Sequence, residues 1–550
     1  MKRQDSLPTL PLRSSKARGL AFFLLALAPL LIGALALYLG QDTNWDLRNY
    51  HWYNAYALVN GRLGFDLLPS QTPFFYNPAL DVPFFLLASH VSAKVAGFIL
   101  GSVQGLNVIL LFMLCHATLI IPNARQKVLV CFALAMLGML GGGGIAQIGT
   151  TFYDNITSLG LFASALMVIR FYPRLIYAPW RIALFFAFIA GLPAGVMMGF
   201  KLPFVIFTVG LCGAMLFVTG AWTRRLCIAF GFGLGVLAGL AIALGPWAWY
   251  LQEHYQSPLF PYFNDIFKSP LAPLDSGRDM QFLPTTWSDR LLFPFIFTIT
   301  PWRVGEIPWR DLRLPALYVL LPLCALIRLA YGRNKHAPDR LVSFYATRYL
   351  LWLAILSYTL WLFMFAIYRY LIPLEMIAPL LIVVAMGMLP LRPAPRTLLT
   401  FYILLAIAVT IQAGDWGRKK PWLDKAISAT VPPIENPSQT MILMAGFEPY
   451  SHIVPSFPPE SAFVRIQSNF SSPEQGKGIN AMMAERIAAH KGVFKLLIPS
   501  YQFFHAAPAL GHFGLTFLPQ KCQAVDDPLF DSKLVLCDVE RTTNFPVQKP

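Results

Sequence analysis

The sequence predicts an α-helical polytopic membrane protein with about 11 transmembrane helices and a small C-terminal α/β domain. First, 56% of its 550 residues are hydrophobic and only 13% are charged, whereas a soluble domain is about 25% charged. Second, apolar runs of membrane-spanning length recur through most of the chain. Third, the basic residues behind the net charge of +16 gather in short loops between those runs. That placement indicates membrane topology, and we expect no nucleic-acid partner.

The N-terminal segment predicts a membrane anchor with a cytoplasmic N-terminus. Residues 1–18 carry five basic residues against Asp5 alone, and residues 19–39 form an uninterrupted apolar run. A cleaved signal peptide would have a shorter core and a small-residue cleavage site, which this segment does not offer.

Ten further apolar runs complete the predicted bundle. They lie near residues 95–121, 128–148, 156–169, 182–200, 202–220, 226–251, 314–331, 350–368, 371–389 and 398–413. Two shorter apolar stretches, 79–89 and 291–299, are interpreted as interfacial or re-entrant pieces. With eleven spans the inner loops hold 19 basic residues against Asp5 and Asp339, as the positive-inside rule requires.

This topology places three large segments on the outer side. They are the loops 40–94 and 252–312 of a membrane domain spanning residues 19–413, and the tail 414–550. The tail contains the strand-like runs "TMILMAG", "FKLLIPS" and "KLVLCDV", with the helix-like "GINAMMAERIAAHKG" among them. That order predicts a small α/β domain.

Two of the seven cysteines, Cys522 and Cys537, lie in this tail, 15 residues apart. In an oxidising compartment such a pair predicts a disulfide. The alternative is two free thiols.

The first outer loop holds the densest group of polar residues. Residues 46–62 predict a helix, and the Pro-rich stretch after them does not. Its Trp and Tyr residues are typical of an aromatic belt at the membrane surface. Its carboxylates point to chemistry instead, because a carboxylate in a partly dehydrated cleft is suited to act as a general base. The polar residues are Asp42, Asp46, Arg48, Asn49, His51, Tyr53 and Asn54.

The segment "NWDLRNYHWYNAYALVNGRLGFD" directly after the first span resembles the GT-C superfamily of integral-membrane glycosyltransferases. The resemblance covers the architecture of the whole chain, including a second large outer loop after span seven. In this plan the chain is similar to bacterial aminoarabinose transferases and protein mannosyltransferases. It implies a polyprenyl-phosphate-linked sugar donor, a bacterial inner-membrane location and a periplasmic C-terminal domain. The adjacent acidic pair common in the family is absent. We therefore expect Asp46, which begins the polar helix, to be the base, with Asp42 as the alternative.

Other candidate site residues lie at predicted outer ends of spans. Asp154 is a second candidate acidic residue, with helix N-capping as the alternative. Arg369 and Lys201 are expected to hold the lipid phosphate, with snorkelling to the headgroups as the alternative. Tyr370, next to Arg369, is expected to bind substrate. Substrate-binding roles are also expected for Arg48, His51, Tyr53, Asn54 and His254.

Three further observations concern phosphate loops, metal sites and the choice between catalysis and transport. The run Gly141–Gly144 has no following Lys, so it predicts close helix packing or a local break and not a phosphate loop. No metal-ligand spacing is present, so no cofactor is expected to be required, although a divalent cation is compatible with the reaction. The conspicuous polar residues lie on one side of the bundle, which favours catalysis there over transport through the midplane.

The predicted function is transfer of a sugar from a polyprenyl-phosphate carrier to a lipid, glycan or protein acceptor. The alternatives are an O-antigen ligase or polymerase, a transporter or flippase of lipid-linked saccharide, and a non-catalytic membrane scaffold. The sugar, the acceptor and the oligomeric state are not determined by the sequence.

Overall fold

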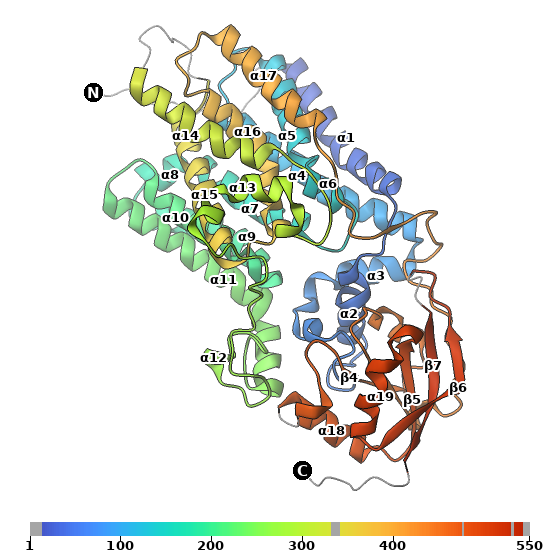
Figure 1. The fold of residues 1–550 in the computed structure, drawn as a ribbon. Coiled ribbons are helices and arrows are strands. Elements are labelled where there is room, and N and C mark those ends of the chain that lie inside the picture. The colour runs from blue at the N-terminus through green and yellow to red at the C-terminus, as the bar shows by residue number, and fades with distance from the viewer. Residues whose placement is uncertain (1–13, 332–340, 476–477, 530–532, 543–550) are drawn as a thin grey trace. The chain divides into compact units, whose positions relative to one another are not determined.

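The computed structural model describes residues 14–331, 341–475, 478–529 and 533–542. Much of the predicted inner charge, including Asp5 and Asp339, lies outside the described residues. The chain divides into two compact units. We call residues 1–39, 97–245 and 279–416 the membrane unit, and residues 40–96, 246–278 and 417–550 the disulfide unit. Figure 1 shows the elements of both units.

Seven helical stretches in the described part are long and apolar enough to cross a membrane, which makes this a multi-pass membrane protein. They are α1 (Ser15–Leu39), α4 (Ala93–Thr118), α9 (Trp180–Phe200), α11 (Trp222–Tyr255), α14 (Arg313–Tyr331), α15 (Phe344–Met364) and the stretch Tyr368–Met386 that contains α16 (Ile372–Met386). Because α16 is apolar on all sides apart from Glu375, it packs on every side and is buried along its whole length.

The other four predicted spans form helices that are shorter than a full crossing. They are α5 (Ala124–Met139), α7 (Asp154–Arg170), α10 (Val205–Ala214) and α17 (Pro393–Val409), with 16, 17, 10 and 17 residues. A helix therefore stands at each of the eleven predicted positions, and seven of the eleven reach spanning length. The two short apolar stretches fall in α3 (Val82–His90) and α13 (Trp287–Ile299).

Close packing of α9 on α11 depends on small residues. A Cβ atom on Gly191 would overlap the carbonyl oxygen of Phe232, and one on Gly235 would overlap that of Phe188. Glycines recur at every fourth residue in both helices, at 191, 195 and 199 in α9 and at 231, 235 and 239 in α11. This is the small-residue spacing that lets membrane helices approach backbone to backbone.

The glycine run after α5 breaks the helix and packs tightly, as predicted. The short α6 (Gly142–Ala146) begins there. The N–H of Gly142 donates to Asp311 Oδ2 at 2.9 Å, and those of Gly143 and Gly144 donate to the two Glu375 oxygens at 3.1 and 2.8 Å. Carboxylates at a helix N-terminus satisfy N–H groups that would otherwise be unpaired in a membrane.

The buried Arg313 completes this group. Its guanidinium donates to the carbonyl oxygens of Gly138 and Leu140 at 3.0 and 2.7 Å and lies 3.4 Å from Asp311. Arg313, Asp311 and Glu375 together tie α14 and α16 to the break between α5 and α6.

The disulfide unit contains a five-stranded mixed sheet in the order β4-β3-β5-β7-β6. The strands are β3 (Thr440–Ala445), β4 (Ala462–Gln467), β5 (Val493–Pro499), β6 (Leu515–Val525) and β7 (Leu534–Arg541), with helices α18 (Ile479–Ala489) and α19 (Phe503–His512). β3 runs parallel to β4 and β5, and β7 runs antiparallel to β5 and β6. The predicted α/β domain is thus confirmed, and β4 and β6 are the strands that the sequence analysis did not find.

The predicted disulfide is present. Cys522 on β6 and Cys537 on β7 are register partners, and they are bonded to each other. A disulfide in this domain fits an extracytoplasmic location.

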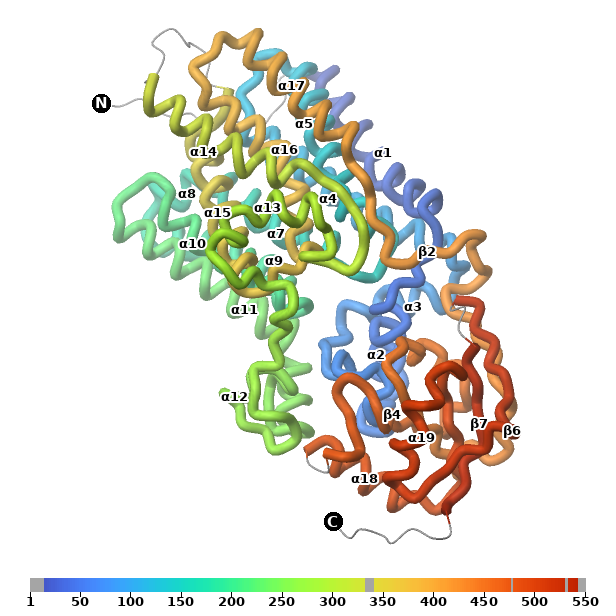
Figure 2. The backbone as a smooth tube through the Cα atoms, viewed as in Figure 1, coloured from blue at the N-terminus to red at the C-terminus, as the bar shows by residue number. Residues whose placement is uncertain are grey.

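The outer segment 40–96 forms one body with the tail (Figure 2). β1 (Gln41–Asp42) pairs with β2 (Arg418–Lys419), and Leu67 bridges in parallel to Val464 at the β4 edge of the sheet. The predicted helix appears as a π-helical turn at Leu47–His51 followed by α2 (Trp52–Val59). The Pro-rich stretch forms only 3₁₀ turns until α3 begins.

We expect Gly141→Ala to destabilise the membrane unit. Its Cβ would overlap the Glu375 carboxylate, and overpacking typically costs about 1–3 kcal/mol. The matched control is Gly245→Ala in α11, where a Cβ would meet nothing within 4 Å. Thermal unfolding of the detergent-purified protein should show a lower Tm for Gly141→Ala and an unchanged or higher Tm for Gly245→Ala. Equal melting temperatures would contradict the carboxylate-capped break.

Candidate functional site

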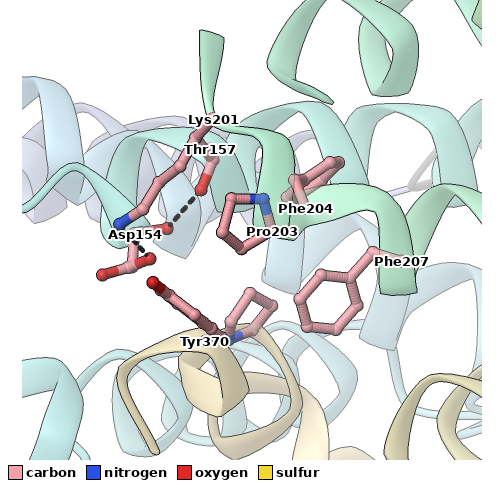
Figure 3. Close-up of a pocket in the computed structure, with 8 residues that line it drawn as sticks. Asp154, Thr157, Lys201, Pro203, Phe204, Phe207 and Tyr370 are labelled. Atoms are coloured by element: carbon pink, nitrogen blue, oxygen red, sulfur yellow. Dashed lines mark hydrogen bonds and ion pairs between the residues drawn. The ribbon is translucent and has the colours of Figure 1, made fainter. Parts of the chain in front are cut away.

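A small pocket at one end of the membrane unit collects the polar residues predicted from separate spans. Asp154 begins α7, Lys201 directly follows α9, and Tyr370 precedes α16. Figure 3 shows their polar ends meeting on one side of the pocket, with the Pro203, Phe204 and Phe207 rings on the other. The sequence analysis placed these three residues at outer ends of different spans, and the fold brings them together.

The carboxylate of Asp154 is the centre of this pocket. Lys201 Nζ lies 2.5 Å from its Oδ1, and Gln147 Nε2 donates to its Oδ2 at 2.9 Å. The residue at the N-cap position of α7 is Tyr153, and no side chain caps the helix there. The Asp154 side chain therefore makes an ion pair with Lys201 and does not cap α7.

Lys201 and Arg369 both contact Phe152. Lys201 Nζ donates to the Phe152 carbonyl oxygen at 2.8 Å and lies 5.4 Å from the centre of the Tyr370 ring. The Arg369 guanidinium stands over the Phe152 ring at 4.5 Å. The Phe152 ring also contacts Trp416, the last residue of the membrane unit. Two cations and a carboxylate thus share one end of the bundle.

Within the outer segment, the structure distinguishes the two acidic candidates. Asp42 is buried, and its Oδ1 accepts from the Asn44 backbone N–H at 3.0 Å and from Asn44 Nδ2 at 2.6 Å. Asp46 is half-buried and accepts from the Tyr50 hydroxyl at 3.2 Å. Because the Asp42 carboxylate closes a local turn, Asp46 is the better candidate for a group that meets substrate.

Three residues predicted to bind substrate are instead engaged inside the protein. His51 Nδ1 lies 2.6 Å from Asp81 Oδ1, and the Tyr53 hydroxyl donates to Asp66 at 2.8 Å. Asn54 donates to the Pro73 carbonyl oxygen at 2.8 Å. All three side chains are buried. These contacts hold the outer segment together.

The strongest ionic contact of the outer segment was not predicted. Arg62 Nε and Nη2 donate to the two oxygens of Asp66, each at 2.7 Å, and the backbone N–H of Phe463 donates to Asp66 at 2.9 Å. Burial raises the pKa of Asp66 even though Arg62 opposes that shift. No helical spacing could have revealed this pair, because α2 ends at Val59 and both residues lie in the turn that follows.

Arg48 lies among acidic groups near the carboxyl ends of the parallel strands. Burial lowers the pKa of its guanidinium, although Glu448, Asp527 and Asp42 act in the opposite direction. Burial and the neighbouring Glu448 raise the pKa of Tyr501 to about 12. β3 is flanked by β4 and β5, so its carboxyl end is a topological switch point, where open α/β sheets bind ligands.

The outer segment occupies the vicinity of this switch point. Gln71 donates to the Phe447 carbonyl oxygen at 3.0 Å, just beyond β3. His452 contacts the Arg48 carbonyl oxygen through Nδ1 at 3.1 Å and Asp527 through Nε2 at 2.8 Å. Of these residues the sequence analysis named only Arg48. Gln71 lies in the Pro-rich stretch, which has no polar pattern, and the others lie about 400 residues or more further along the chain.

His254 is exposed in the last turn of α11. Its Nδ1 lies 2.9 Å from the Tyr250 carbonyl oxygen, and its ring stacks on Tyr250 at 4.2 Å. Its neighbour Tyr255 packs on Phe75 of the outer segment. His254 stays a predicted lining residue.

Comparison of the chain with protein-family models, with curated proteins and with solved structures found no match. The class of protein that the fold itself defines is a multi-pass helical membrane protein with a C-terminal α/β domain that carries a disulfide.

We expect Asp66→Asn to unfold the disulfide unit more readily. The change leaves the buried Arg62 without its carboxylate, and breaking a buried ion pair costs about 3–5 kcal/mol. The control is Asp538→Asn, which breaks the more exposed pair with Lys495 and should cost about 1 kcal/mol or less. Limited proteolysis of the tail should speed up for Asp66→Asn alone. Equal proteolysis rates would show that the Arg62–Asp66 pair does not hold the outer segment to the sheet.

Proposed function

We propose that the protein is a membrane glycosyltransferase that moves a sugar from a polyprenyl-phosphate carrier to an acceptor hydroxyl on the outer side of the membrane. The observation that carries the proposal is the pocket in which Asp154, Lys201 and Tyr370 meet, with Arg369 beside it. Cations within a membrane bundle are costly and are retained for function. A phosphate is the ligand that a lysine and a guanidinium fit best.

The eleven-span topology belongs to this proposal. Seven helices are of spanning length, and the four shorter ones, among them α7, would complete an eleven-span bundle with an inner N-terminus and an outer tail. In that topology the Asp154 end of α7 faces outward. An outer site has no access to cytoplasmic nucleotide sugars, so a lipid-linked donor is required.

The proposed reaction assigns one task to each kind of group. The base takes the proton of the acceptor hydroxyl, the acceptor oxygen bonds to the anomeric carbon, and the bond from that carbon to the phosphate oxygen breaks. The electron pair leaves with the polyprenyl phosphate, whose charge Lys201 and Arg369 stabilise. Asp154 positions Lys201 through their ion pair.

Asp46 is the proposed base. A carboxylate that takes a proton must give up any ion pair that it makes, which disfavours Asp154. Asp42 is bound by Asn44 in its local turn. Asp46 accepts from a tyrosine hydroxyl and is half-buried, so part of its side chain stays accessible to an acceptor hydroxyl.

A buried ion pair in a membrane unit is also typical of a transport pathway, so a transporter or flippase of lipid-linked saccharide is the second candidate. The Lys201–Asp154 pair is the observation that favours it. A ligase or polymerase of O-antigen type would use the same phosphate-binding cations.

The donor assay separates these functions. We expect purified protein to transfer label from a polyprenyl-phosphate sugar to an acceptor lipid or glycan extract, and to leave a nucleotide sugar untouched. Transfer from the nucleotide sugar alone would contradict the proposal. Movement of intact lipid-linked sugar across vesicles, with no transfer, would establish the transporter instead.

Substitutions test the assigned roles. Asp46→Asn should keep its Tm and lower turnover by about 10²–10⁴-fold, the usual effect of losing a general base. Lys201→Gln should raise KM for the lipid donor, because it removes a phosphate contact. Asp42→Asn is the matched control and should lower Tm more than turnover. Loss of turnover in Asp42→Asn with normal turnover in Asp46→Asn would reverse the two roles.

A further inference from the structure

A buried basic cluster lies at the opposite end of the membrane unit from Asp154. Its members are His116 in the last turn of α4, Lys127 in the first turn of α5 and Arg170 in the last turn of α7. Asp154 and Arg170 are the two ends of α7, about 24 Å apart along its axis. Lys127 and Arg170 both act electrostatically on the His116 ring, and Arg170 acts on Lys127, so the three groups lie within electrostatic range of one another.

Two of the three side chains are protected from solvent. Only 4% of His116 and 8% of Lys127 is exposed, and Arg170 is half-buried. Both ring nitrogens of His116 and the Nε and Nη2 of Arg170 are buried and make no hydrogen bond. Within the described ranges, none of the three residues forms an ion pair with a carboxylate.

Helix dipoles do not account for this arrangement. A cation in the last turn of a helix is stabilised by the dipole, which helps Arg170, but Lys127 lies in a first turn, where the dipole disfavours it. The dipole effect is also a small fraction of the desolvation cost of a buried ion. Buried donors without acceptors are rare in folded proteins, and each one requires an explanation such as a bound ion.

We propose that His116, Lys127 and Arg170 form a binding site for one phosphate group. A phosphate supplies the negative charge and the several acceptor oxygens that these donors lack. The positive end of α5 adds to the attraction. The site goes beyond the proposed transferase and does not depend on it.

Two kinds of molecule can supply the phosphate: an anionic lipid headgroup and a soluble phosphate. The disulfide domain fits an extracytoplasmic location, and the chain enters α4 from the disulfide unit, so the far end of α4 faces the cytoplasm. Basic pockets between helices on that side bind anionic lipid headgroups. A soluble phosphate from the cytoplasm would meet the same donors.

Thermal unfolding of the full-length protein tests the site. The protein is purified in a neutral detergent without phosphate, and phosphatidylglycerol, phosphatidylcholine or inorganic phosphate is then added. We expect phosphatidylglycerol to raise Tm saturably by about 5 °C, as a ligand specific for the folded state does. Phosphatidylcholine, which has no net charge, should not. A rise with phosphatidylglycerol alone assigns the site to a lipid, and an equal rise with inorganic phosphate assigns it to a soluble anion.

Variants of the cluster locate the effect. Lys127→Gln removes a buried charge, so it should raise Tm without any anion and abolish the anion-dependent rise. Arg170→Gln should abolish that rise independently, in case the first variant does not fold. The matched control is Arg125→Gln, which removes an exposed charge from the same turn of α5 and should keep the full rise. No anion-dependent rise in the wild type, or an equal rise in all the variants, would overturn the proposal.

Discussion

A charge buried in a membrane protein must find its partner within the protein or in a bound ligand, because hydrocarbon offers none. The membrane unit shows this constraint at three places. Glu375 and Asp311 accept from the N–H groups of the glycine run, with Arg313 beside them. At one end of α7, Asp154 and Lys201 are paired at 2.5 Å. At the other end, no carboxylate among the described residues pairs with the basic cluster, and an anion completes it in the proposal made above.

The Glu375 group and the Asp154–Lys201 pair have different roles, because their surroundings differ. The Glu375 carboxylate is fully buried and receives three donors, the N–H groups of Gly143 and Gly144 and the hydroxyl of Tyr368. Such a group fixes the backbone and is closed to substrate. Asp154 and Lys201 line a pocket, and the Lys201 side chain is 21% exposed. An ion pair with one accessible member can exchange its partner for a ligand oxygen, so this pair is the better functional candidate.

The same distinction holds in the disulfide unit. Asp66 and Arg62 satisfy each other and tie the outer segment to β4 through Phe463 and Ser461. Asp46 accepts from the Tyr50 hydroxyl at 3.2 Å and is half-buried. Both carboxylates lie in the outer segment 40–96, and burial separates them: Asp66 is buried, whereas Asp46 keeps part of its surface accessible to a substrate.

The sequence by itself determined the features that depend on local composition. Apolar runs located a helix at each of eleven positions, because the bilayer selects long apolar helices wherever they occur. Strand-like runs gave β3, β5 and β7, and Cys spacing gave the disulfide. The tertiary structure alone decided which distant residues meet. The contacts of Asp66 with Phe463 and of Arg62 with Ser461, the Lys201–Asp154 pair and the closure of the glycine run by Glu375 each join segments whose contact no periodicity encodes. Hydrophobic pattern reports how one segment is solvated, whereas a buried charge is satisfied by whatever the fold brings beside it.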